Sequence, residues 1–325
     1  MCALFGWLDY KHIVPYKVLK HLTQALANAA EERGTDAAGI SYIRDGKVTI
    51  FKRPKPAHKV HFNAPAGTTA IMGHTRLTTQ GNQKFNQNNH PFPGHADKEF
   101  AFAHNGVLYN DEQLRKGKNL PVTNIETDSY VAVQLIEQQK KLDFDSLKSM
   151  AEMVQGNFTF TVLDETNTLY IIKGSNPMFL IHFEELGLYA YASTESIKKT
   201  ALKKVGMKHI PYTRIGAVHG DILRIDSNGL LSRSEFEETD YKYVSWYGLP
   251  YDDDYEDEEL YTSHEQLLFD ICNYYGIDKY DIMLLLDYGY TADEIEDMLM
   301  NHNLLHSTIQ NIKCNNYYDN FLFEE

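Results

Sequence analysis

The sequence has few cysteines and lacks long apolar runs. Only 3 of its 325 residues are cysteine, namely Cys2, Cys272 and Cys314, and their spacing fits neither a metal site nor a disulfide framework. No stretch of about 18 apolar residues occurs, so we expect no membrane span. A basic segment followed by an apolar core is missing from the start, so we predict no signal peptide. A free thiol favours a reducing compartment, and we therefore expect a cytoplasmic protein.

Basic residues are scarce in the last part of the chain. Residues 233–325 hold 23 acidic and 4 basic residues, a net charge of −19, whereas residues 1–232 carry a net charge of +5. This asymmetry predicts a domain boundary near residue 232. Because an acidic surface repels phosphates, we expect no nucleic acid as a partner. The sequence also lacks a P-loop, and no pattern in it indicates a metal or another cofactor.

The most informative feature that is present is Cys2, directly after Met1. Cysteine is small enough to permit removal of the initiator methionine, which would give Cys2 a thiol and a free α-amine. An α-amine has a pKa near ~8, so a useful fraction is neutral at pH 7 and can act as a general base for the thiol. Many proteins begin in this way by chance, so the downstream residues decide what Cys2 does.

Three further segments hold side chains that suit a small substrate with a carboxylate, an ammonium and an amide. In chain order they are residues 73–82 (GHTRLTTQGN) with Arg76 and Thr79, residues 103–108 (AHNGVL) with Asn105 and Gly106, and residues 125–129 (IETDS) with Asp128. Arg76 offers a planar fork for a carboxylate, and Asp128 offers the opposite charge for an ammonium group. Asn105 and the backbone N–H of Gly106 can stabilise the oxyanion that forms when a thiol attacks an amide.

Each of these residues also has a purely structural interpretation. Arg76 and Asp128 could form an ion pair, and Asn-Gly is a common dipeptide at hairpin turns, so Asn105 and Gly106 could form a turn. His90 and His104 are interpreted here as structural histidines whose hydrogen bonds are satisfied. The joint occurrence of Cys2 and the three segments in order favours the functional interpretation of the set.

Together with residues 32–40 (ERGTDAAGI), these segments resemble the class II glutamine amidotransferases, which are N-terminal-nucleophile enzymes. The resemblance covers roughly the first 230 residues and is clearest to the glutaminase domains of glucosamine-6-phosphate synthase and glutamine phosphoribosyl-pyrophosphate amidotransferase. Where glucosamine-6-phosphate synthases usually carry Trp and His, this chain has Leu77 and Gln80. The resemblance implies Cys2 as nucleophile, Asn105 and Gly106 as oxyanion hole, and Arg76, Thr79 and Asp128 as glutamine-binding residues.

The pattern of apolar residues predicts an α+β protein with two antiparallel sheets. A buried strand at residues 3–8, a helix at residues 16–26, and hairpins over residues 39–51 and 158–172 are expected. Polar residues 127–129 are expected to cap a following helix. The resemblance implies a four-layer α/β/β/α sandwich over residues 2–232. An acidic linker at residues 233–262 and a small acidic helical region at residues 263–325 are predicted to follow.

Three functions fit these observations. The first is hydrolysis of L-glutamine through a Cys2 thioester, with ammonia delivered to a separate acceptor or synthase subunit, because roughly 90 further residues are too few for a synthase domain. The second is an amidase of the same fold that acts on another amide. The third is a non-enzymatic glutamine sensor or scaffold. Cys2 argues against the third, and Arg76 and Asp128 favour free glutamine over another amide.

Overall fold

The computed structural model describes two compact units, which lie within Met1–Tyr241 and Lys242–Glu325. The described residues are 2–237, 268, 271–272, 277, 279–287, 290–299, 304–310 and 312. Most of the predicted acidic linker and Cys314 lie outside these residues. Each unit is treated by itself below.

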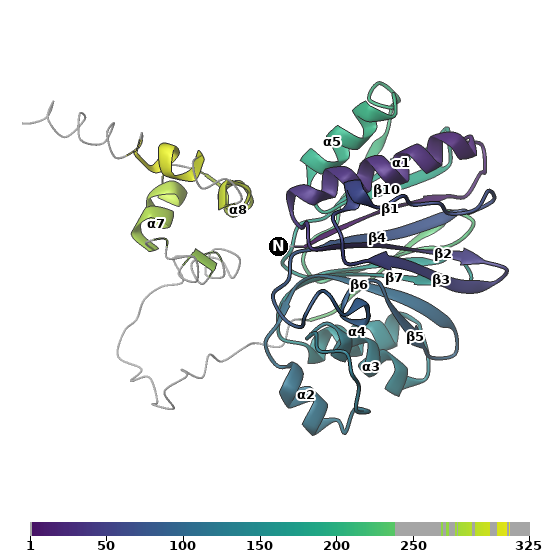
Figure 1. Cartoon of the computed structure of the whole chain (residues 1–325), viewed down its shortest axis with the longest axis horizontal. Helices are drawn as coiled ribbons and strands as arrows, with labels where there is room; N and C mark the ends of the chain where they lie inside the picture. Colours follow the sequence, from purple (N-terminus) through teal and green to yellow (C-terminus); the bar gives the residue numbers. More distant parts are fainter. Residues whose placement is uncertain are drawn as a thin grey trace, which may run out of the picture. The chain divides into compact units, whose positions relative to one another are not determined.

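Two antiparallel sheets form the first unit (Figure 1). In spatial order, the seven-stranded sheet contains β11 (Thr213–Ile215), β9 (Phe179–Phe183), β10 (Leu188–Ala192), β1 (Ala3–Asp9), β4 (Ala70–Arg76), β2 (Ala37–Arg44) and β3 (Lys47–Arg53). The six-stranded sheet contains β13 (Leu231–Glu235), β12 (Asp221–Ile225), β8 (Leu169–Lys173), β7 (Gly156–Asp164), β6 (Glu99–Leu108) and β5 (Phe92–His95).

Helices cover the outer face of each sheet, so the unit has four layers. The first sheet carries α1 (Tyr16–Ala29) and α5 (Glu195–Lys204) (Figure 1). The second carries α2 (Asp111–Gly117), α3 (Tyr130–Gln139) and α4 (Phe144–Met153). The predicted α/β/β/α sandwich is therefore confirmed.

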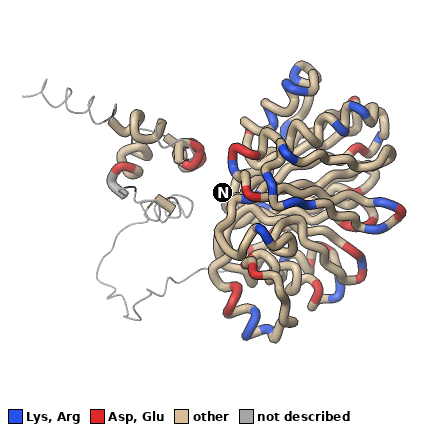
Figure 2. The backbone as a smooth tube through the Cα atoms, viewed as in Figure 1, with Lys and Arg blue, Asp and Glu red and all other residues tan. Residues whose placement is uncertain are grey.

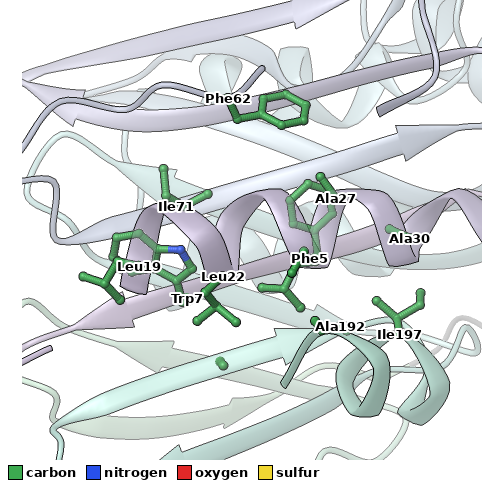
Figure 3. Close-up of a cluster of buried hydrophobic side chains, with 14 of the residues drawn as sticks. Phe5, Trp7, Leu19, Leu22, Ala27, Ala30, Phe62, Ile71, Ala192 and Ile197 are labelled. Carbon is green, nitrogen blue, oxygen red and sulfur yellow. The ribbon is translucent and has the colours of Figure 1, made fainter. Parts of the chain in front are cut away.

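The alternation of side chains along β1 explains how the layers are held together. Phe5 and Trp7 point toward α1 and α5 and pack in a cluster that includes Leu22 (Figure 3). Leu4 and Leu8 point the other way, into the cluster between the two sheets. Burying one such side chain contributes about 1.5–3 kcal/mol, so β1 stabilises two interfaces at once.

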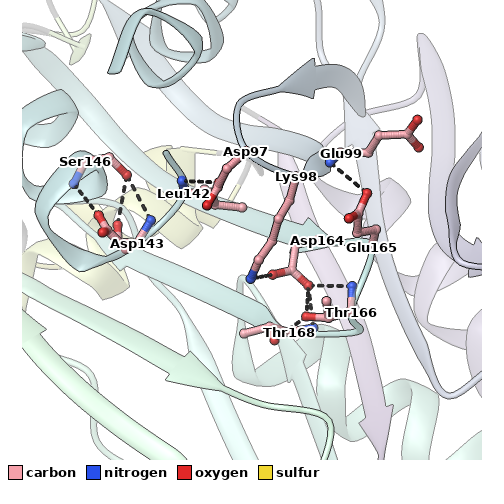
Figure 4. A network of polar contacts seen from close by, with 10 residues as sticks. All are labelled: Asp97, Lys98, Glu99, Leu142, Asp143, Ser146, Asp164, Glu165, Thr166 and Thr168. Carbon is pink, nitrogen blue, oxygen red and sulfur yellow. Dashed lines mark hydrogen bonds and ion pairs between the residues drawn. The ribbon is translucent and has the colours of Figure 1, made fainter. Parts of the chain in front are cut away.

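Local polar contacts fix the ends of several elements. The β2–β3 hairpin turns at Asp45 and Gly46, both with positive φ (52° and 71°), as its Asp-Gly dipeptide predicts. Asp143 and Ser146 form a capping box at the start of α4, which Figure 4 shows. The same figure shows the fully buried Asp164, which accepts a bond from Nζ of Lys98 at 3.1 Å and fixes the β7–β8 turn.

Strand β13 crosses the domain boundary that the charge pattern predicts near residue 232. It pairs with β12 over its whole length, from Leu231 to Glu235. Phe236, which follows it, is 4% exposed and packs against Phe158 in the core beneath α3 and α4. Ordered structure of the first unit thus continues past the change in charge.

The second unit contains α7 (Lys279–Asp287) and α8 (Ala292–Leu299) around its own apolar cluster. Ile282 and Ile295 are fully buried in that cluster. Thr291 and Glu294 exchange backbone-to-side-chain hydrogen bonds of 2.9 and 3.3 Å, which makes a capping box for α8. Acidic residues lie on both helices, whereas the first unit shows both signs of charge interspersed (Figure 2). None of the helices that the structure describes is long and apolar enough to span a membrane.

Candidate active site

Cys2 lies directly before β1, the central strand of the seven-stranded sheet, and is only 8% exposed. Its thiol donates a 3.5 Å hydrogen bond to the carbonyl of Leu77. Nε of Arg33 donates to the carbonyl of Cys2 at 3.0 Å and so holds the main chain. Burial raises the pKa of the Cys2 thiol. The thiol is therefore protonated at neutral pH and needs a base before it can act as a nucleophile.

Arg76 ends strand β4, the neighbour of β1. Because Ala3 faces Thr75 in this pairing, the next residue, Arg76, lies beside Cys2. Its Nη1 donates to Oδ1 of Asn89 at 2.7 Å, and its Nη2 donates to the carbonyls of Gln80 and Gly81. These bonds fix the guanidinium, which is 3% exposed, and leave its Nε–H and one Nη1–H for a ligand.

The carboxylate of Asp128 is held by the N–H of Leu108 and the hydroxyl of Ser129, and not by Arg76. Its Oδ2 accepts a 2.6 Å bond from the N–H of Leu108, and its own N–H donates to Oε1 of Gln80 at 3.0 Å. The α3 helix does begin after residues 127–129, but no side chain there caps it, which differs from the sequence prediction. Within the described part of the chain, Arg76 and Asp128 form no direct ion pair, so the ion pair that the structural interpretation expects is absent.

Asn105 and Gly106 lie inside strand β6 and not in a turn. They face Thr159 and Phe158 of β7, so the hairpin-turn alternative is excluded. Asn105 is fully buried, and neither atom of its side-chain amide has a hydrogen-bond partner. Gly106 has φ 142°, and a Cβ at this position would lie 1.8 Å from the carbonyl oxygen of Asn157. Only glycine fits here, and a buried amide without a partner, such as that of Asn105, is uncommon in a folded protein.

Three buried histidines pack next to these residues. His104 is satisfied as predicted, because Nδ1 lies 2.8 Å from Oγ of Ser129 and Nε2 lies 3.2 Å from the carbonyl of Asn157. His90 differs from the prediction: its ring centre lies 4.3 Å from that of His74, with the two rings tilted by 34°, but neither of its nitrogens has a hydrogen-bond partner. Burial lowers the pKa of His74 to about 3 and that of His90 well below its usual value, so both rings are neutral.

These elements surround one pocket of about 240 Å³, part of it open to solvent. Its lining contains most of the predicted site residues and several others: Cys2, Arg76, Leu77, Thr79, Gln80, His90, His104, Gly106, Thr127, Asp128 and Ser129. Asn105, which precedes Gly106 on β6, is not among the lining residues. The described residues hold no group of His, Cys, Asp or Glu arranged to bind a metal ion.

The sequence analysis missed Asn89, which orients Arg76, and the side chain of Gln80, which joins the Arg76 loop to Asp128. No local signal sets Asn89 apart from Asn86 and Asn88. Its role follows only from the path of the loop between β4 and β5.

Comparison with known proteins finds glutamine amidotransferases. Residues 74–198 match the model of a glutamine amidotransferase domain. The glutamine–fructose-6-phosphate aminotransferase (isomerizing) of Staphylococcus aureus is 30% identical over 194 residues, which is 55% of this chain and 30% of that protein. The enzyme of the same name from Staphylococcus epidermidis is 30% identical over 189 residues. Residues 74–198 of this chain are therefore similar to glutamine amidotransferase domains.

The fold of this amidotransferase domain agrees with a solved structure. The glutamine phosphoribosylpyrophosphate amidotransferase of B. subtilis superposes with a TM-score of 0.58 and 22% identity, covering 73% of this chain and 50% of that one. This likeness supports the four-layer fold. The chain spans about a third of the length of the staphylococcal relatives, so their whole reactions do not transfer to it.

Proposed function

We propose that the chain hydrolyses L-glutamine to glutamate and ammonia through a thioester on Cys2. The observation that carries the proposal is the unpartnered, fully buried amide of Asn105, whose neighbour in the chain, Gly106, lines the same pocket as Cys2, Arg76 and Asp128. A buried donor without a partner costs free energy, about 1–3 kcal/mol, unless a ligand uses it. An oxyanion at this position would satisfy Asn105 and the N–H of Gly106 together.

The proposed reaction begins with removal of Met1. The free α-amine of Cys2 takes the thiol proton, and the thiolate attacks the side-chain amide carbon of glutamine. Asn105 and Gly106 stabilise the tetrahedral oxyanion. The α-ammonium returns the proton to the leaving nitrogen, ammonia departs, and a thioester remains. Water then attacks the thioester, with the same amine as general base, and releases glutamate and the thiol.

Arg76, Thr79 and Asp128 are the proposed glutamine-binding residues. The free Nε–H and Nη1–H of Arg76 would meet the α-carboxylate, and the carboxylate of Asp128 would meet the α-ammonium. The ammonia is proposed to pass to a separate acceptor or synthase subunit, and the proposed compartment is the cytoplasm.

Ammonia release from L-glutamine by the purified protein tests the proposal. Intact-mass measurement on the same sample should show that Met1 is absent, and 6-diazo-5-oxo-L-norleucine, an electrophilic glutamine mimic, should label Cys2. Protein that has lost Met1 and still neither releases ammonia nor reacts with this compound would refute glutamine hydrolysis. Release of ammonia from another amide, but not from glutamine, would support the amidase alternative instead.

A further inference from the structure

Lys52 is a partly buried lysine that has no part in the proposed reaction. It lies on β3, at the edge of the seven-stranded sheet. Its Nζ donates to the carbonyls of Asn89 and Pro91, the residues on either side of His90. The same nitrogen lies 5.1 Å from the centre of the Phe92 ring. A single ammonium group thus holds both ends of one short segment.

That segment carries the residue that orients Arg76. The side chain of Asn89 accepts the 2.7 Å bond from Nη1 of Arg76 and donates a 2.8 Å bond to the carbonyl of Gln83. Lys52 therefore reaches Arg76 through one intermediate residue. A shift of the Asn89 main chain would move the guanidinium, because the fork has a fixed geometry.

We propose that Lys52 is a positioning residue, which holds Asn89 in place so that Arg76 keeps its orientation toward the α-carboxylate of glutamine. The inference rests on the proposed glutamine hydrolysis. It predicts that loss of the ammonium group weakens substrate binding and leaves the chemical step intact, because Lys52 contacts neither Cys2 nor Asn105.

The surroundings of Lys52 make this clamp sensitive to pH. The ionisable groups that act on it or feel its charge are Arg76 and His74 on β4 and His90 in the clamped segment. Both histidines are neutral, and Lys52 has no carboxylate partner among the described residues. Burial, assisted by the charge of Arg76, lowers the pKa of Lys52 to about 8. Above that pH the amine is neutral and its hydrogen bonds lose their charge assistance.

The test compares wild type with Lys52→Met and Lys52→Arg in steady-state glutamine hydrolysis from pH 6.5 to 9.5. Lys52→Met should raise KM roughly tenfold or more at pH 7 and leave kcat within about twofold, since a charge-assisted hydrogen bond is lost. Wild-type KM should rise as the pH passes through about 8. Lys52→Arg keeps its charge throughout this range, so its KM should lack that rise. Lys47→Met, at the exposed start of β3, is the matched control and should behave as wild type.

Two thiol reagents separate positioning from damage to the site. Lys52→Met should slow labelling of Cys2 by 6-diazo-5-oxo-L-norleucine, which carries an amino acid head group, but not by iodoacetamide, which does not. Equal slowing with both reagents, or a wild-type KM for Lys52→Met, would overturn the proposal. If Lys52→Met is insoluble, a wild-type KM that is the same at pH 7 and pH 9 would overturn it. A wild type that never releases ammonia would instead refute the proposed function.

Discussion

The two halves of the candidate site are built in different ways. The half that would do the chemistry lies on paired strands: Cys2 precedes β1, and Asn105 and Gly106 lie within β6. The half that would hold the substrate is fixed by loops: Arg76 ends β4, but its guanidinium is held by the loop that follows, and Asp128 lies before α3 and bonds to the N–H of Leu108 and to Gln80. Strand pairing fixes the reacting atoms, whereas a network of single hydrogen bonds fixes the binding groups. Changes in the first half should therefore lower kcat, and changes in the second should raise KM.

The largest expected effect is at the nucleophile. Cys2→Ala should abolish glutamine hydrolysis, by at least about 10⁴-fold, because the thiol has no substitute. Cys272→Ala is the control, since this buried thiol lies in the other unit and burial raises its pKa to about 12. An ammonia assay measures both. Full activity in Cys2→Ala would show that Cys2 is not the nucleophile.

A smaller loss is expected at the oxyanion position. Asn105→Ala should lower kcat roughly 10²–10³-fold with little change in KM, because the lost donor acts only on the transition state. The control is Asn167→Ala, on the turn between β7 and β8. If Asn105→Ala instead raises KM and leaves kcat unchanged, Asn105 is a substrate-binding residue and the comparison between the halves fails.

The loop-built half should show the opposite pattern. Arg76→Lys keeps the positive charge but loses the fork that Asn89 orients, so KM for glutamine should rise on the order of 10- to 100-fold while kcat changes little. Asp128→Asn should act in the same direction. Steady-state kinetics with L-glutamine separates the two constants. A fall in kcat alone would show that these residues act on the reacting amide.

A modest effect is expected where the loop meets the Asp128 segment. Gln80→Ala removes the acceptor for the N–H of Asp128, which costs about 0.5–1.5 kcal/mol, so KM should rise roughly 2- to 10-fold. Gln87→Ala, on the exposed part of the same loop, should leave KM unchanged. Equal effects of both changes would mean that the loop tolerates no alteration at all.

The smallest effect is expected from removing the second unit. A chain that ends after Tyr241 should keep its glutamine hydrolysis, because no residue of the described pocket lies beyond Ser129. A chain that ends after Ser232 should be less stable, because it lacks most of β13 and also Phe236. Loss of the buried Phe236 side chain alone should lower the free energy of unfolding by about 3–5 kcal/mol. Thermal unfolding measures the stability of each truncated chain, and the ammonia assay measures its activity. Loss of activity on cutting after Tyr241 would assign the second unit a role in the site.

Sequence reasoning succeeded where a residue's role depends on local pattern. The β1 strand and the hairpin that turns at Asp45 and Gly46 both follow from neighbours in the chain. It failed where the role depends on long-range contacts. The carboxylate of Asp128 meets the N–H of Leu108, 20 residues away, and so it does not cap α3 as a neighbouring polar residue would.

The site itself divides in the same way. Cys2, Arg76 and Gly106 have a chemistry that a reader of the sequence can recognise, and the pocket brings them together. The residues that hold them in place by hydrogen bonds cannot be recognised from the sequence in this way. Lys52 reaches Asn89 from 37 positions away, across the edge of a sheet, and nothing in its neighbourhood distinguishes it from other strand lysines.

The pairing of β1 also sets when the site can exist. β1 sits between β4 and β10, and the second of these is made of residues 188–192, so Phe5 meets a partner 187 positions later, Ala192. Contacts this distant close slowly and late in folding. On the ribosome, Cys2 emerges long before β10, so its sheet cannot be completed until almost the whole domain has been translated. A nascent chain that stops short of β10 thus carries the thiol of Cys2 without the sheet that buries it, and the proposed nucleophile has no complete site until synthesis of the domain is nearly finished.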